Sequence, residues 1–158
     1  SGILRINLEE APVVFPFVAT CGHELNEFTD GLEGTLHLFW ADTIKMLALG
    51  SAMSMLDEHL KERVSPAELS CMNPGSLEDW PLQQQLPMFD LLGEAPQTIG
   101  VRLTKSYVLI PLKSVTGMQF VTKEKFMNCR LCPRENCEGR SAPYQAGLYE
   151  KRYGNALK

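Results

Sequence analysis

A long stretch of helical periodicity, from Thr35 to about Arg63, constrains the fold of this chain more than any other feature. Apolar and small side chains recur there at steps of three and four residues, which places them on one face of a helix: Leu36, Trp40, Ile44, Leu47, Ser51 and Met55. Gly50 lowers the stability of such a helix by about 1 kcal/mol relative to alanine. This cost, within a run of small residues, predicts that the helix packs closely against a neighbouring element.

The segment before this helix predicts a strand. Ala11–Thr20 is a compact apolar run rich in β-branched and aromatic residues, and its length favours a buried strand over a helix. Pro16 cannot donate a hydrogen bond to a neighbouring strand, so we expect this strand at a sheet edge or at a bulge. Residues 1–10 alternate between polar and apolar side chains, which we interpret as an edge strand or a lead-in.

The rest of the pattern predicts further short elements. Two helices are expected at residues 24–32 and 83–92, and strands at residues 101–110 and 114–121. Asp79 or Ser76 is a candidate cap for the second of these helices. Gly117 marks a bulge or a close backbone approach within the last strand. The sequence therefore predicts an α+β fold, with a mostly antiparallel sheet and two or three packed helices.

Between the long helix and the helix that follows it lies a proline- and glycine-containing loop, Ser70–Pro81. Pro74 fixes its own φ and pushes Asn73 towards extended geometry. Gly75 permits a left-handed turn and puts no side chain between the backbone and a ligand. Two interpretations remain open, a structured connection between helices and a cradle for a ligand.

A chain of 158 residues with 44% hydrophobic content can bury one core, so we expect a single domain over residues 1–158. The net charge of −4 is not concentrated in runs, which argues against nucleic acid as a partner. No apolar run reaches the roughly 20 residues that cross a bilayer, and no signal peptide is recognisable, so we expect a cytoplasmic protein without a membrane partner. Because the chain begins with Ser1-Gly2 rather than Met, we interpret it as an excised domain or as one that lacks its native start.

Three of the five cysteines lie close together, in a segment (residues 128–158) that we treat as a C-terminal extension: Cys129, Cys132 and Cys137. An odd number of cysteines with this spacing indicates metal ligation in a reducing compartment more than a disulfide framework. Three soft thiolates suit Zn²⁺ or an iron–sulfur cluster. A closed tetrahedral site needs a fourth ligand, and the candidates are Cys71, Cys21 and His23. Free thiols, or a redox dithiol with a bystander, remain the alternative.

Five short motifs follow one another in an order that is similar to a known family: Phe17-Val18-Ala19-Thr20-Cys21-Gly22, Leu60-Lys61-Glu62-Arg63-Val64, Asn73-Pro74-Gly75, Leu103-Thr104-Lys105-Ser106 and Ser114-Val115-Thr116-Gly117. From about Phe15 to Met127, the chain resembles the activation (reactivation) domain of cobalamin (vitamin B12)-dependent methionine synthase. The resemblance implies a curved antiparallel sheet with packed helices, shaped to clamp on a corrinoid-binding module.

In that family the domain binds S-adenosylmethionine along the Pro-Gly loop. The resemblance therefore implies cofactor-binding residues at Asn73, Pro74, Gly75, Ser76 and Met127. A reductant supplies an electron to inactive cob(II)alamin on the partner module, and S-adenosylmethionine then methylates the cobalt. The chain would thus be an accessory factor in methionine biosynthesis, part of a methyltransferase system with no complete active site of its own.

The family has an arginine at the position of Cys71, and that position lines one pocket with the position of Met127. The resemblance therefore implies that Cys71 lies near the cysteine cluster. Our hypothesis is one metal centre with Cys71 as its fourth ligand beside Cys129, Cys132 and Cys137, and with Cys21 as the alternative. An iron–sulfur cluster there would supply the electron to cobalt.

Three functions are thus weighed for the chain. The first is the reactivation domain that uses S-adenosylmethionine. The second is an iron–sulfur electron-transfer protein that reduces a corrinoid partner without binding S-adenosylmethionine. The third is a binding module with a structural zinc site. Binding of S-adenosylmethionine separates the first from the second, and the identity of the metal separates the second from the third.

Overall fold

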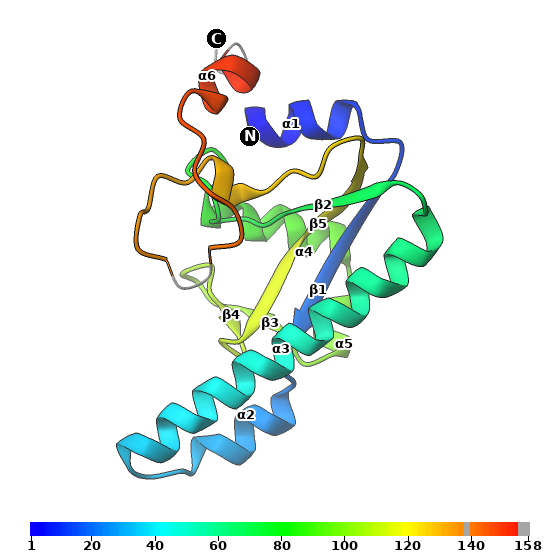
Figure 1. Cartoon of the computed structure of the whole chain (residues 1–158). Coiled ribbons are helices and arrows are strands. Elements are labelled where there is room, and N and C mark those ends of the chain that lie inside the picture. The colour runs from blue at the N-terminus through cyan, green and yellow to red at the C-terminus, as the bar shows by residue number, and fades with distance from the viewer. Residues whose placement is uncertain (138–139, 155–158) are drawn as a thin grey trace.

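The computed structural model describes residues 1–137 and 140–154. Its centre is an open, three-stranded antiparallel sheet (Figure 1), whose strands lie in the order β1 (Val14–Thr20), β5 (Ser114–Thr122) and β2 (Glu68–Met72). The predicted α+β class with an antiparallel sheet is confirmed. β1 is an edge strand, as Pro16 predicts, because the missing N–H of proline costs no ladder hydrogen bond there.

The other elements are short, with one exception. The exception is α3 (Thr35–Val64), which follows α2 (His23–Asp30) in a helical hairpin. The remaining elements are α1 (Gly2–Glu9), the 3-10 turn η1 (Leu82–Gln84), α4 (Gln85–Leu92), α5 (Ala95–Thr98), the hairpin strands β3 (Arg102–Leu103) and β4 (Leu109–Ile110), the 3-10 turn η2 (Asn128–Arg130) and α6 (Leu148–Tyr153). No helix among the described residues combines the length and the apolarity needed to cross a membrane.

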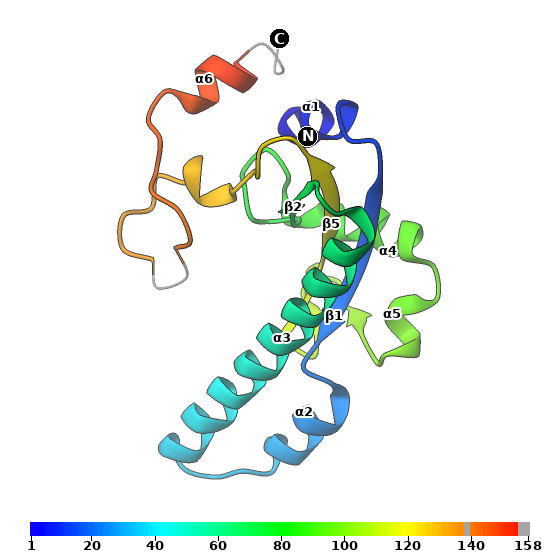
Figure 2. The same ribbon diagram turned by 45° about the vertical axis from the view of Figure 1, so that its right-hand side comes forward.

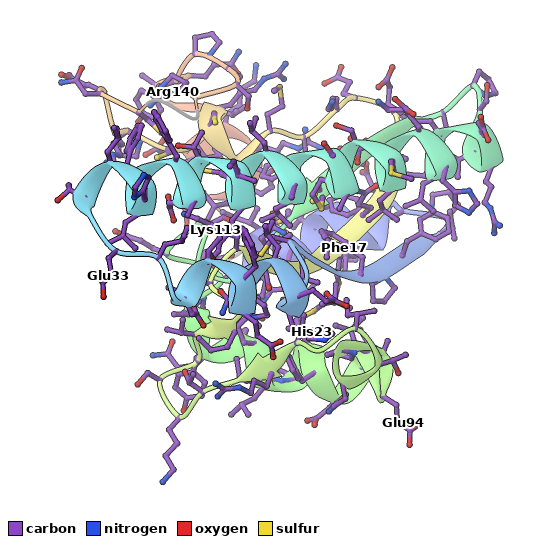
Figure 3. All side chains as sticks on the ribbon, turned by 90° about the horizontal axis from the view of Figure 1, so that it is seen from below. Phe17, His23, Glu33, Glu94, Lys113 and Arg140 are labelled. Carbon is purple, nitrogen blue, oxygen red and sulfur yellow. The ribbon has the colours of Figure 1, made fainter. Side chains whose placement is uncertain are left out.

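The two faces of the central strand β5 bury different cores, because successive side chains of a strand point to opposite faces. Phe120 belongs to the larger core, which α1, α4 and α6 help to enclose: Ile3, Met72, Trp80, Met88, Phe126 and Tyr153. Val121 faces the other way and packs against Leu60 of α3 and Leu69 of β2. The sheet is therefore covered on one face by α3 and on the other by α4 (Figure 3).

Gly117 lies in the middle of β5, where three segments come close together. A Cβ atom at this position would lie 2.5 Å from the carbonyl oxygen of Met72 and 3.0 Å from Phe17 Cε1, and it would also clash with the amide nitrogen of Asn73. These distances are shorter than real Cβ contacts. The close backbone approach that the sequence predicts at this glycine is confirmed.

The edge-strand interpretation of residues 1–10 is wrong, because Gly2–Glu9 form helix α1 and not a strand. Ser1 caps the helix by accepting a hydrogen bond from the N–H of Leu4 at 3.0 Å. The Asp79 carboxylate accepts a second set of hydrogen bonds from the N–H groups of Gly2 (3.2 Å) and Ile3 (2.8 Å). Asp79 therefore caps α1, which is distant in sequence, and not the helix that follows it.

α3 forms where the sequence predicts it, but the close packing expected at Gly50 is wrong. No atom of the described neighbours lies within 4 Å of a Cβ atom built on Gly50. The predicted apolar face is exposed, with Leu47 at 67% and Met55 at 71% of their full accessibility. This face lies on the side of α3 opposite to Leu60, which packs on the sheet. In addition, the α2–α3 hairpin extends beyond the end of the sheet, so the sheet covers only the second half of α3 (Figures 1 and 2).

Candidate functional site

The Pro-Gly loop begins directly after β2, because Ser70–Met72 are already part of that strand. Gly75 has a φ of 86°, the left-handed conformation that the sequence predicts. Its N–H donates to the carbonyl oxygen of Trp80 at 2.7 Å, and the N–H of Ser76 donates to that of Asn73 at 3.2 Å. Trp80 is buried in the larger core and therefore anchors the far end of the loop.

Asn73 attaches the loop to the central strand. Its side-chain amide donates to the carbonyl oxygen of Thr116 at 2.9 Å. The Thr116 hydroxyl in turn donates to the side-chain carbonyl of Gln85 on α4, and both of these side chains are buried. This chain of hydrogen bonds holds the loop, β5 and α4 in one arrangement.

Residues 73–76 form one wall of a cavity of about 420 Å³, which we call the loop pocket. The opposite wall comes from α4, the β3–β4 hairpin and the start of β5: Gln85, Tyr107, Val108, Leu109, Leu112, Ser114, Val115 and Thr116. Tyr107 has a φ of 62°, which is uncommon for a residue with a side chain. The lining of the loop pocket is uncharged, so this pocket suits a neutral ligand or a neutral part of one.

A second cavity of about 330 Å³, the thiol pocket, lies between α3, the sheet and the segment that follows β5. Cys71, Met127 and Cys129 all line this pocket, and Asn73 lines both pockets. The structure therefore brings together the two positions that the resemblance places in one pocket, and it adds Cys129 to them. Asp57 on α3 supplies a carboxylate to the same lining.

The thiol pocket contains hydrogen-bond acceptors that lack a donor. The side-chain amide nitrogen of Gln119 donates to Asp57 Oδ1 at 2.7 Å, which fixes the orientation of the amide. Gln119 Oε1 is buried and has no hydrogen-bond partner among the described residues, and the same holds for Asn128 Oδ1. Buried polar atoms are nearly always paired in native proteins. The Asp57 carboxylate, which lines the pocket, makes it suitable for a ligand with N–H donors.

The pKa values of the two thiols in this pocket are shifted in opposite directions. The Ser141 hydroxyl lies 3.3 Å from Cys129 Sγ, and the Ser141 N–H donates to the same sulfur at 3.4 Å. These hydrogen bonds lower the pKa of Cys129, and the Arg140 guanidinium adds to the effect. Burial, with the nearby Asp57 carboxylate, raises the pKa of Cys71 to about 12.

Cys129 is therefore expected to react with iodoacetamide before Cys71, because the thiolate is the nucleophile. Mass spectrometry after limited alkylation at neutral pH measures the order of modification. As the pH rises, the alkylation rate of Cys129 should reach its plateau at a lower pH than the alkylation rate of Cys71, since the pKa of Cys71 is about 12. Ser141→Ala should slow the reaction of Cys129 and leave Cys71 unchanged. Faster alkylation of Cys71 would contradict this assignment.

The cysteine-containing loop is folded around the side chain of Arg140, which Figure 3 labels. Its guanidinium donates to the carbonyl oxygens of Cys129 at 3.1 Å, Cys132 at 3.2 Å and Ala142 at 3.2 Å, and to that of Arg134. One half-buried cation therefore links carbonyl groups of the described segments 129–134 and 140–142. Cys132 lines a third pocket together with Ser76, while Cys137 is half-buried.

The four cysteines of the hypothetical metal centre are brought together only in part. Within residues 1–137 and 140–154, no three His, Cys, Asp or Glu side chains are arranged to hold a metal ion, so the four-cysteine centre stays a prediction. Cys21 is not near the others: its N–H donates to Lys113 at one end of β5, whereas Cys71 pairs with Gln119. Six residues of strand separate these points, or about 20 Å.

Several lining residues escaped the sequence analysis. Three of them lie outside the motifs singled out in the sequence: Asp57, Gln85 and Gln119. Thr116 belongs to the Ser114–Gly117 motif but was not considered as a pocket residue. The signal that the sequence offered for these lining residues was a polar side chain within an apolar helix or a central strand. Gln119 and Thr116 are both fully buried on β5, where an uncompensated polar side chain is costly.

The geometry defines an α+β protein with an open antiparallel sheet and two pockets that meet at a Pro-Gly loop. In comparisons with known proteins, no family model and no curated protein sequence matches this chain.

Proposed function

We propose that this chain is an accessory domain that supports the reductive remethylation of cob(II)alamin, carried by a corrinoid-binding module, with S-adenosylmethionine as the methyl donor. One observation supports the proposal above the others. The segments that carry the resemblance to the reactivation domain, Asn73-Pro74-Gly75 and Ser114–Gly117, lie side by side through the Asn73–Thr116 hydrogen bond. Both segments border the loop pocket, and Asn73 also borders the thiol pocket with Met127.

The chemistry of the thiol pocket is compatible with S-adenosylmethionine. This cofactor supplies a methyl group on a sulfonium centre and carries an ammonium group, and both charges are positive. The Asp57 carboxylate is the acceptor suited to the ammonium group. Lys125 lines the same pocket and is the cation available for the ligand carboxylate, in the role that an arginine at the position of Cys71 has in the family.

The test is titration calorimetry with S-adenosylmethionine. Asp57→Asn is expected to weaken binding by about tenfold or more, because charge-assisted hydrogen bonds are worth about 1.5–3 kcal/mol. Asp42→Asn is the matched control, since Asp42 lies on α3 outside both pockets. Absence of binding by the parent protein, or equal affinity of the Asp57→Asn variant, would count against the proposal. A corrinoid protein then reports function through the loss of its cob(II)alamin absorbance when reductant, S-adenosylmethionine and this chain are all present.

A second candidate function is supported by a separate observation, namely that Cys71 and Cys129 line the same pocket. An iron–sulfur cluster held by these thiols with Cys132 and Cys137 would make the chain an electron donor to a corrinoid partner. Zinc in the same place would make it a binding module with a structural metal. The two metals differ in electronic absorption and in the presence of acid-labile sulfide.

Metal and sulfide analysis of protein purified without oxygen tests this candidate. Iron with sulfide and a visible absorption band supports the cluster, and colourless zinc supports the structural site. Cys71→Ser should lower the metal content, whereas Cys21→Ser should leave it unchanged because Cys21 lies at the other end of β5. Full metal content in the Cys71→Ser variant, or no metal in the parent, would exclude the four-cysteine centre.

A further inference from the structure

The solvent-facing side of α3 carries a row of apolar and small side chains that we call the arm face: Leu36, Trp40, Ile44, Leu47, Ser51 and Met55. The opposite side of the helix packs against other elements, since Ala41 and Leu60 are buried there. α3 is therefore apolar on both sides, a pattern typical of helices that are buried all round. None of the described residues covers the arm face.

The arm face carries no charged side chain between Leu36 and Met55, and Glu58 borders its far end. Asp42 and Lys45 are the charged residues between Leu36 and Met55, and both are turned to other partners. Asp42 pairs with Lys113 at 3.0 Å, and Lys45 lies 4.0 Å from Asp30 of α2. A solvent-exposed surface normally carries interspersed charges. A large uncharged apolar patch marks an interaction site.

The arm face has two halves of complementary shape. The first half, up to Leu47, consists of large side chains. The second half begins with small residues: Gly50, Ser51 and Ser54 line a shallow groove of about 510 Å³ together with Met46, Leu47, Met55 and Glu58. Large side chains of one helix would therefore fit the groove of a second helix with the same sequence, provided that the two helices run in opposite directions.

We propose that the arm face binds a second copy of this chain, with the two α3 helices antiparallel about a twofold axis. An axis midway between Leu47 and Ser51 places Leu47 over Ser51 of the second copy and Ile44 over its Ser54. Each contact then occurs twice, as a twofold interface requires. The same register brings the indole N–H of Trp40 to the Glu58 carboxylate of the second copy, which gives this N–H an acceptor.

The size of the arm face is compatible with a stable dimer. Its five large side chains retain between 52% and 71% of their full accessibility. Their burial removes about 500 Å² of apolar surface from each copy. The small residues and the helix backbone add to this area, and a standard interface buries about 800 Å² per partner. The dimer is independent of the function proposed above.

The experiment is analytical ultracentrifugation of the 158-residue chain over a range of concentrations. The parent is expected to dimerise, and Leu47→Glu should weaken the dimer at least about a hundredfold, because a carboxylate is then buried without a partner. Leu91→Glu is the matched control, since Leu91 is similarly exposed but lies on α4, and it should dimerise like the parent. Circular dichroism verifies that both variants are folded. A monomeric parent, or a Leu47→Glu variant that dimerises normally, would overturn the proposal.

A mixing experiment tests the register. Ser51→Arg alone should also weaken self-association, because the long side chain fills the groove. Mixed with Leu47→Glu, it should form a heterodimer, since the carboxylate introduced into one copy then faces the guanidinium introduced into the other, while the second Leu47–Ser51 contact is unchanged. A mixture that remains monomeric would overturn the antiparallel pairing.

Discussion

Gly117→Ala is expected to destabilise the protein by about 3 kcal/mol, because overpacking a site without room for a methyl group forces the backbone to move. The added Cβ would meet the carbonyl oxygen of Met72 at 2.5 Å, and backbone cannot rotate away as a flexible side chain can. It would also meet the Asn73 amide nitrogen, which bonds the Pro-Gly loop to Thr116. The substitution should therefore disturb the loop pocket together with the sheet.

Urea unfolding measures this effect as a lower midpoint at an unchanged slope. Gly31→Ala is the matched control, because Gly31 has a φ of −90° and no atom lies within 4 Å of its added Cβ. The control should remain within about 0.5 kcal/mol of the parent. If the two variants unfold at the same urea concentration, the close approach of β2 and β5 at Gly117 is not present in solution.

Trp80→Ala should cost about 4 kcal/mol, in the range measured when a large aromatic side chain is removed from a core. Trp80 is only 3% exposed and packs in the cluster that contains Phe120 and Tyr153. Its carbonyl oxygen also accepts the hydrogen bond from Gly75 that closes the Pro-Gly loop. Loss of the side chain should therefore loosen the loop as well as the core.

Thermal unfolding by circular dichroism measures the loss of stability. Hydrogen exchange at the N–H of Gly75 reports the loop separately, and it should become faster in the variant. Leu91→Ala removes a large apolar side chain from the surface of α4 and should change stability by no more than about 0.5 kcal/mol. A small effect of Trp80→Ala would show that the loop is not anchored through the core.

Together these residues explain why the candidate site is rigid. The Pro-Gly loop is fixed at one end by Trp80, in the middle by its left-handed glycine, and at the start by Asn73. The two pockets on either side of Asn73 are thus positioned by the same contacts that stabilise the sheet. A ligand that occupies either pocket would meet a preorganised wall, which lowers the entropic cost of binding.

Local chemistry was sufficient to predict most elements. Pro16 predicted an edge position or a bulge and Gly117 predicted a bulge or a close approach, and the structure shows the edge position and the close approach. The left-handed turn at Gly75 and the helix Thr35–Val64 likewise depend on properties of single residues or on periodicity. These predictions succeeded because the forces concerned act over a few neighbouring residues.

Helix α1 is an element that local sequence patterns did not predict. Its sequence alternates like a strand over a stretch too short to separate the two periods. The helix is selected by partners distant in the chain, since Ile3 bonds to Asp79 and Asn7 accepts a hydrogen bond from Tyr153 at 3.1 Å. The composition of the thiol pocket has the same origin, because Asp57 and Gln119 meet there only when α3 lies across the sheet.

The sequence by itself determined most of the secondary-structure elements, the turn at the Pro-Gly loop and the existence of an apolar row on the long helix. Only the tertiary structure decided which side of that helix is buried and which side chains border the two pockets. The physical reason is that periodicity places side chains on a common face, whereas burial depends on which other element reaches that face. For the row from Leu36 to Met55, no element among the described residues does, because the row lies on the side of α3 opposite to Leu60, which packs on the sheet.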